Sequence, residues 1–190
     1  MALLTAKSWL ILLPPKVGSQ WIVAALRAAG IAFEEVGARH AIRSDLPGAY
    51  AGVAAFVRHP ADWHASYWAY RSSERSNWDP AWTLDAWCAS AHWDEYIEAA
   101  TTRCAGYVSR MFADYTTPEQ GETVIVGKQE HLRADLIRLL EAMGEAFDHD
   151  VISRLEPLNN SPNKPWISDQ QRLAIYQSER SGFDRYGYNL

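Results

Sequence analysis

The sequence predicts an α/β protein in which a parallel sheet of about four strands carries helices on both faces. Short apolar runs alternate along the chain with stretches of helical periodicity, the order that is typical of strands joined by helices. One run, residues 52–57, is apolar throughout, as expected for a strand covered on both faces. The 190 residues are 48% hydrophobic and contain no linker or internal repeat, so residues 1–190 are expected to form a single domain.

The first half of the chain contains three of the expected strands. Residues 8–13 form an apolar run that stops at two prolines, and a helix is expected over residues 19–29, where Gly30 ends it. The second strand is expected over residues 31–36. After a loop with one short helix, the third strand covers residues 52–57.

The second half is expected to be mostly helical. Pro60 suits the first position of a helix and Asp62 suits its first turn, so a helix is expected over residues 60–71. The remaining expected elements are a polar loop at 72–79, helices with breaks over 80–115, a loop at 116–121, a strand over 122–127, an amphipathic helix over 130–143, an irregular segment at 158–165 and a final helix after Ser168.

Charge and hydropathy narrow the classes of function. The chain has 18 Lys and Arg against 23 Asp and Glu, a formal net charge of −5, whereas a protein that binds nucleic acid through phosphate contacts is more often basic. A small anionic ligand still fits, because it needs only a local cluster of positive groups. The first apolar run is too short for a signal-peptide core or a membrane span. We therefore expect a cytoplasmic protein without a nucleic-acid or membrane partner.

Cysteine and tryptophan usage point to a helical core in the second half. Cys88 and Cys104 lack CxxC spacing, so we expect two reduced, buried thiols and no metal site. Four of the nine tryptophans crowd residues 78–93, where they form either core packing, a helix interface or one wall of a substrate pocket. The sequence leaves these alternatives and the oligomeric state open.

The turn after the first strand predicts an anion site. Lys16 stands between the two prolines and the helix that starts near Ser19. A helix N-terminus presents backbone N–H groups and the positive end of the helix dipole, and here a lysine lies beside it. This geometry suits a phosphate-like or sulfate-like group.

A second cationic position follows the third strand. Arg58 comes directly after the apolar run, and Ser66 lies eight residues later on the expected helix. A guanidinium offers paired N–H donors to a phosphate, and a hydroxyl can add another donor. Taken singly, Arg58 also fits a surface salt bridge and Ser66 a solvent-facing hydroxyl.

These segments resemble the PAPS-dependent sulfotransferases, a P-loop sulfotransferase-like family. Residues 15–21, PKVGSQW, resemble the PKSGTTW-type loop that binds the 5′-phosphosulfate. Residues 58–67, RHPADWHASY, resemble the 3′-phosphate motif RxPxDxxxSxY with its arginine-to-serine spacing intact. Residues 127–132, GKQEHL, and the closing YGY at 186–188 resemble later segments of the family more loosely.

The resemblance implies a P-loop-like parallel sheet and a donor, 3′-phosphoadenosine 5′-phosphosulfate (PAPS), whose desulfated product is adenosine 3′,5′-bisphosphate. It implies that Lys16 contacts the 5′-phosphosulfate and stabilises charge on the leaving phosphate, and that Arg58 and Ser66 hold the 3′-phosphate. The acceptor would be a hydroxyl or amine of a small molecule, saccharide or lipid. The residues that would wrap the 5′-phosphosulfate are Gly18, Ser19, Gln20 and Trp21.

The family also implies a general base soon after the second strand. His40 follows residues 31–36 and is the candidate, since a neutral imidazole suits proton abstraction near pH 7. A loop histidine on the surface is the alternative for His40, while His59 is expected at the start of a helix and His64 on the surface. Glu34 and Glu35 are weaker candidates for the same role.

Two departures from the family pattern keep other functions open. Gln20 stands where threonine is usual, and the C-terminal RKG-type loop is missing, with Lys164 as the nearby cation that would replace it. A non-catalytic nucleotide-binding protein of the same fold is one alternative. A P-loop kinase-like phosphotransferase is another, although the Lys16 turn lacks its GxxxxGK[ST] motif.

Overall fold

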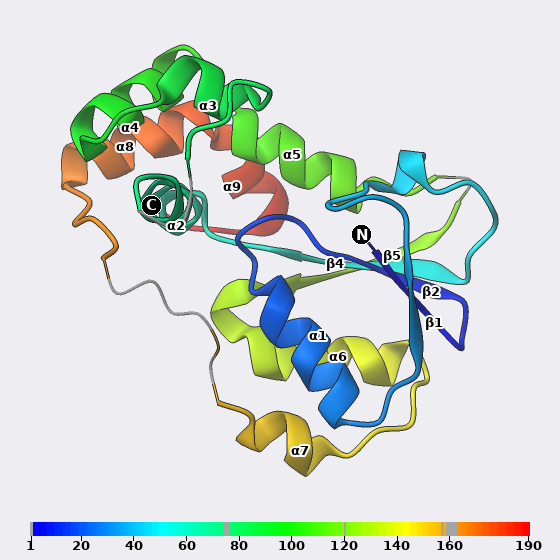
Figure 1. The fold of residues 1–190 in the computed structure, drawn as a ribbon. Coiled ribbons are helices and arrows are strands. Elements are labelled where there is room, and N and C mark those ends of the chain that lie inside the picture. Colours follow the sequence, from blue (N-terminus) through cyan, green and yellow to red (C-terminus); the bar gives the residue numbers. More distant parts are fainter. Residues whose placement is uncertain (1, 74–76, 120, 157, 159–162) are drawn as a thin grey trace. The chain divides into compact units, whose positions relative to one another are not determined.

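The computed structural model describes residues 2–73, 77–119, 121–156, 158 and 163–190, and these divide into two compact units (Figure 1). The first unit comprises Met1–Arg58 with Phe112–Asn159, and the second comprises His59–Met111 with Asn160–Leu190. The prediction of a single domain stays a prediction. Parts of three predicted loop segments, residues 74–76, 120 and 159–162, lie outside the described residues.

The first unit contains a five-stranded sheet with the order β3-β1-β2-β4-β5. Its neighbours β2, β4 and β5 are parallel, as predicted. The strands are β1 (Ala2–Thr5), β2 (Trp9–Leu12), β3 (Phe33–Val36), β4 (Gly52–Val57) and β5 (Thr123–Lys128).

The prediction of a wholly parallel sheet is wrong, because β1 pairs antiparallel with both β2 and β3. The four strands that the sequence predicts all run in one direction, and the unpredicted β1 lies between two of them. A tight turn joins β1 to β2: Ser8 has φ 62°, and its backbone N–H donates to the Thr5 carbonyl at 3.0 Å. The sheet is therefore mixed, in an α/β unit.

Strand β4 is the buried centre of this sheet. All six of its residues are buried, as predicted from its continuous apolar sequence. Phe56 pairs in register with Gly127 of β5, and a Cβ on Gly127 would lie 2.6 Å from the Phe56 ring. Gly127 therefore makes room for the largest side chain of β4.

Helices α1 (Ser19–Ala28), α6 (Leu132–Ala142) and α7 (His149–Arg154) gather on one side of this sheet (Figure 1). Helix α6 buries Leu136, Leu139 and Leu140, the apolar face that its periodicity predicts. Helices over the second face stay a prediction.

Short 3₁₀ turns complete the first unit, at η1 (Arg43–Asp45) and η2 (Gln129–His131). Arg43 forms a buried ion pair with Glu122 at 2.6 Å. This pair joins the loop after β3 to the residue before β5.

The second unit is built from helices. Helix α2 starts at Pro60 as predicted, and the His59 ring caps it by accepting the Ala61 N–H at 3.3 Å. The predicted final helix is two helices that meet at Glu179. The elements are α2 (Pro60–Arg71), α3 (Thr83–Cys88), α4 (Trp93–Thr102), the start of α5 (Tyr107–Thr116), α8 (Asp169–Ser178) and α9 (Arg180–Tyr186).

The core of the second unit is aromatic. Trp63 and Tyr96 are fully buried. Trp93, one of the four tryptophans of residues 78–93, is 8% exposed, so the core-packing alternative applies to it. His64, expected on the surface, is 1% exposed, and this expectation is wrong. None of the helices within the described ranges is long and apolar enough to cross a membrane.

Candidate functional site

The loop between β2 and α1 carries the predicted anion site. Strand β2 ends at Leu12, and α1 begins at Ser19. Lys16 has φ 66° and Gly18 has φ 86°, so the chain enters the left-handed region twice within this loop. The Ser19 hydroxyl donates to the Pro14 carbonyl at 3.0 Å. This bond closes the loop and fixes the start of α1 beside Lys16.

Gly18 also makes the loop fit against the segment after β5. A Cβ at Gly18 would lie 2.8 Å from Cδ2 of Leu132, the first residue of α6. The position therefore requires glycine for both its backbone angle and its space. Two of the segments singled out in the sequence, 15–21 and 127–132, are in contact here.

Arg58 joins the end of β4 to the Lys16 loop. Its Nη1 donates to the Lys16 carbonyl at 2.9 Å, and the residue is 6% exposed. Because β2 and β4 are parallel neighbours, their carboxyl ends meet at the same edge of the sheet. The two motifs that the sequence singles out are thus joined by a hydrogen bond within the first unit.

His40 lies at the same edge of the sheet. Its Nδ1 is 2.9 Å from the Leu13 carbonyl oxygen, which directly follows β2. A carbonyl oxygen can only accept, so Nδ1 carries the proton, and Nε2 holds the lone pair of the neutral ring. On its other side, Tyr115 donates its hydroxyl to the His40 carbonyl at 2.7 Å. These bonds hold His40 at φ 59°, an unusual backbone angle for a non-glycine residue.

The surroundings keep the His40 imidazole neutral near pH 7. Burial is the largest influence and lowers its pKa, and the positive charge of Arg39 acts in the same direction. The hydrogen bond to the Leu13 carbonyl opposes this shift, but the net change is downward. The ring is therefore prepared to accept a proton at Nε2, which has no partner among the described residues.

The structure thus brings Lys16, His40 and Arg58 together, and we call these three residues the strand-end cluster. They come from three separate parts of the sequence and are linked through the loop at residues 13–18. Helix α1 begins at this loop, and its first N–H groups have no partner within a helix. Positive side chains, helix N–H groups and a neutral imidazole can together bind an anion and accept a proton beside it.

The other predicted site residues have different positions. Gln20 is exposed in the first turn of α1, whereas Trp21 is 3% exposed and its indole N–H donates to the Glu156 carbonyl at 3.1 Å. The Trp21 side chain is therefore part of the core. Ser66, 5% exposed on α2, and Lys164, exposed before α8, belong to the second unit, so the strand-end cluster is described without them.

The weaker base candidates lie on the edge strand β3, where Glu34 and Glu35 are both exposed. Glu35 forms an exposed ion pair with Arg27 at 3.1 Å. Sequence reasoning missed Tyr115, which holds the His40 backbone from a position 75 residues away. No spacing in the sequence connects these two residues.

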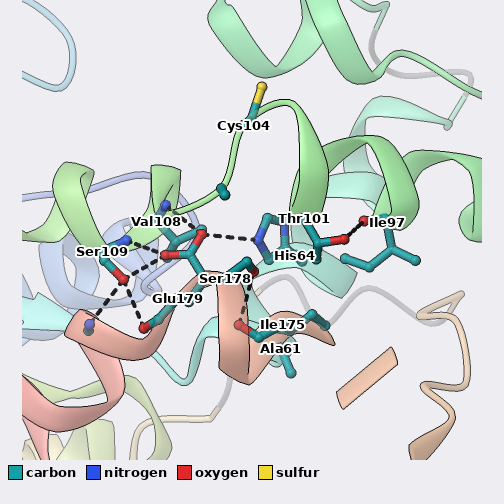
Figure 2. Close-up of polar contacts among 12 residues, drawn as sticks. Ala61, His64, Ile97, Thr101, Cys104, Val108, Ser109, Ile175, Ser178 and Glu179 are labelled. Atoms are coloured by element: carbon teal, nitrogen blue, oxygen red, sulfur yellow. Dashed lines mark hydrogen bonds and ion pairs between the residues drawn. The ribbon is translucent and has the colours of Figure 1, made fainter. Parts of the chain in front are cut away.

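The second unit contains another polar cluster, centred on Glu179 (Figure 2). The Glu179 carboxylate accepts the N–H groups of Val108 at 3.1 Å and Ser109 at 2.8 Å, and the Ser109 hydroxyl at 2.6 Å. Glu179 therefore caps the N-terminus of α5. His64 lies on its other side, with Nε2 3.7 Å from Oε1, while Nδ1 is 3.0 Å from the Tyr96 hydroxyl.

The order of these groups is not that of a nucleophilic triad. A catalytic serine is activated by a histidine, which a carboxylate orients in turn. Here the carboxylate lies between the other two, and among the described residues no hydrogen bond joins Ser109 to His64. All three side chains are buried. We therefore assign this set, the buried cluster, to holding helices together.

Burial on its own would raise the pKa of Glu179, but the neighbouring His64 imidazole and the hydrogen bonds from Ser109 outweigh it and lower the pKa. The carboxylate is therefore ionised at neutral pH.

In the part of the chain that the structure describes, no group of three or more His, Cys, Asp or Glu side chains is arranged to hold a metal ion.

Comparisons of this chain with protein-family models, with curated proteins and with solved structures found no significant match.

Proposed function

We propose that this protein is a PAPS-dependent sulfotransferase that transfers a sulfuryl group to a hydroxyl or amine of a small-molecule, saccharide or lipid acceptor. The observation that carries the proposal is the meeting of Lys16, His40 and Arg58 at the carboxyl ends of β2 and β4. The two motifs that resemble the family's donor-binding segments supply Lys16 and Arg58.

In the proposed reaction the acceptor oxygen or nitrogen forms a bond to sulfur while the bond from sulfur to the bridging phosphate oxygen breaks. Negative charge develops on the departing 5′-phosphate. Lys16 and the first N–H groups of α1 provide positive potential where this charge would develop. The protein forms no covalent bond, and its contribution is in-line positioning and charge stabilisation.

His40 is proposed to take the acceptor proton through Nε2. Its hydrogen bond to the Leu13 carbonyl leaves that nitrogen as the acceptor, and its lowered pKa keeps the ring neutral near pH 7. Arg58 is proposed to bind the donor's 3′-phosphate and, through the Lys16 carbonyl, to position the loop that binds the 5′ end.

Calorimetric titration with adenosine 3′,5′-bisphosphate tests the proposal. We expect the wild type to bind and Arg58→Ala to bind at least about tenfold more weakly, because it loses a charged phosphate contact. Arg27→Ala removes an exposed arginine on α1 and is the matched control, which should bind like the wild type. Absence of binding by the wild type, or undiminished binding by Arg58→Ala, would overturn the proposal.

A second candidate is a nucleotide-binding protein of the same kind without transfer activity. The observation that favours it is Gln20, which places an exposed amide in the first turn of α1 where the resembled motif has a hydroxyl. Release of adenosine 3′,5′-bisphosphate from PAPS, measured with mixed phenol, saccharide and amine acceptors, separates the two candidates. Turnover that falls at least about a hundredfold in His40→Ala supports the sulfotransferase, since general-base catalysis contributes about that much.

A further inference from the structure

The second unit contains a pocket of about 350 Å³ whose lining includes no residue of the strand-end cluster or of the buried cluster. This volume lies within the range that small-molecule sites occupy. The pocket is lined by residues of α3, of the turn after α4 and of the start of α5, namely Thr83, Trp87, Arg103, Cys104, Tyr107 and Arg110.

One wall of the pocket is an exposed indole. Trp87 is 61% exposed, which makes it one of the most exposed large apolar side chains in the described chain. Aromatic side chains normally gain stability by burial, so an indole left open beside a pocket offers a surface for stacking. Trp82, 43% exposed at the start of the same helix, does not line the pocket and serves as its comparison.

Two guanidinium groups also line the pocket. Arg103 donates through Nη1 to the Trp87 carbonyl at 3.4 Å, and Arg110 donates through Nη1 to the Ala105 carbonyl at 2.9 Å. Within the described ranges neither forms an ion pair with a carboxylate. Arg71, in contrast, forms an ion pair: its Nε lies 3.0 Å from Oδ2 of the buried Asp85. A guanidinium has five N–H donors, so Arg103 and Arg110 keep most of theirs for a bound anion.

Gly106 leaves room for the Arg110 guanidinium beside the backbone. A Cβ on Gly106 would lie 2.7 Å from Nη1 of Arg110, and Gly106 has φ 77°. The guanidinium therefore rests against a glycine that no other residue replaces without strain. Its bond to the Ala105 carbonyl holds it there.

The buried face of the pocket is uncharged. Cys104 is 5% exposed, and the Cys88 thiol donates to its sulfur at 3.6 Å. Burial raises the pKa of Cys88 to about 12, and the bond to Cys104 acts in the same direction. The Cys88 thiol is therefore neutral and does not offset the positive charge of the two arginines.

We propose that this pocket binds a small planar aromatic anion, with the ring against Trp87 and its carboxylate, sulfonate or phosphate between Arg103 and Arg110. The proposal stands independently of the sulfotransferase assignment, because none of its residues belongs to the strand-end cluster.

Calorimetry with two probes of matched shape tests it on the full chain. Naphthalene-2-carboxylate should bind, and the neutral naphthalene-2-carboxamide should bind at least about tenfold more weakly, because it lacks the charge that the arginines recognise. Arg103→Gln, Arg110→Gln and Trp87→Ala should each weaken carboxylate binding by at least about threefold, and the double arginine variant by at least about tenfold. The exposed substitutions Arg172→Gln and Trp82→Ala are matched controls and should leave it unchanged.

The proposal is overturned if the wild type does not bind the carboxylate, if acid and amide bind equally, or if the double arginine variant binds like the wild type. Arg58→Ala should keep naphthalene-2-carboxylate binding intact. Loss of the probe in Arg58→Ala with retention in the double arginine variant would place the probe at the strand-end cluster and also overturn the proposal. Adenosine 3′,5′-bisphosphate binding that survives in the double arginine variant and fails in Arg58→Ala separates the two sites.

Discussion

The strand-end cluster and the buried cluster use polar groups in opposite ways. In the strand-end cluster, His40 and Arg58 bind backbone carbonyl groups, and both Lys16 and His40 have positive φ. In the buried cluster, a carboxylate binds a hydroxyl and two N–H groups and pairs with an imidazole, all within regular helices or at their ends. The first cluster is held in unusual backbone geometry, whereas the carboxylate of the second is held by hydrogen bonds from Val108 and Ser109.

This difference separates a candidate site from a structural network. Unusual backbone angles cost free energy and persist where surrounding contacts enforce them, which is frequent at functional sites. A buried carboxylate with several donors stabilises the fold and presents nothing to a ligand. Substitutions in the two clusters test this separation.

Glu179→Ala should reduce the free energy of unfolding most, by about 3 kcal/mol, because it leaves buried donors on Val108 and Ser109 without an acceptor. Glu179→Gln should cost less, since its amide oxygen still accepts one bond. Urea denaturation measures both, with the exposed Glu98→Gln as control. A loss below 1 kcal/mol in Glu179→Ala would contradict the structural assignment.

Gly18→Ala should destabilise the protein by about 1–3 kcal/mol, because alanine is strained at φ 86° and its Cβ meets Leu132. It should also weaken nucleotide binding by moving the Lys16 loop. Leu132→Ala removes the clash. Gly18→Ala should therefore cost less stability in a Leu132→Ala background than in the wild type. Strict additivity in this double-mutant cycle would show that the contact does not constrain the loop.

The smallest expected effect is a pH dependence due to His40. Because its folded-state pKa lies below the ordinary value near 6.5, the unfolded chain binds more protons between the two values. Stability should therefore fall as the pH is lowered from about 6.5 to the folded-state pKa. His40→Gln should remove this part of the slope, which unfolding curves at several pH values measure. NMR can follow the titration of His40 directly. A pKa at or above 6.5 for this residue would contradict the predicted environment.

Much of the fold and of the strand-end cluster follows from the sequence, for a physical reason. Continuous apolar runs are typical of parallel strands, and ligand-binding residues follow their carboxyl ends, so the sequence alone placed Lys16 and Arg58 at strand ends. The partners of Arg58 and His40 could not, because they are backbone carbonyl groups, which carry no residue signature.

The missed features share another cause. Strand β1 is four residues long and is separated from β2 by one turn, so the sequence has no signal for its reversed direction. His64 is buried because helix α2 is covered nearly all round and because Glu179, 115 positions away, supplies its partner. Pairings at such distances come from tertiary structure and not from local pattern.

Strand β1 acts as a spacer in the architecture of the candidate site. It separates β3 from β2, so the turn after β3 must cross two inter-strand intervals, about 10 Å, to bring His40 to Leu13. The reach of the proposed base is therefore set by the width of a strand that contributes no side chain to the cluster. Redesign of the site for a larger acceptor would begin at this spacer, where the distance is determined, before any residue that touches the reaction is changed.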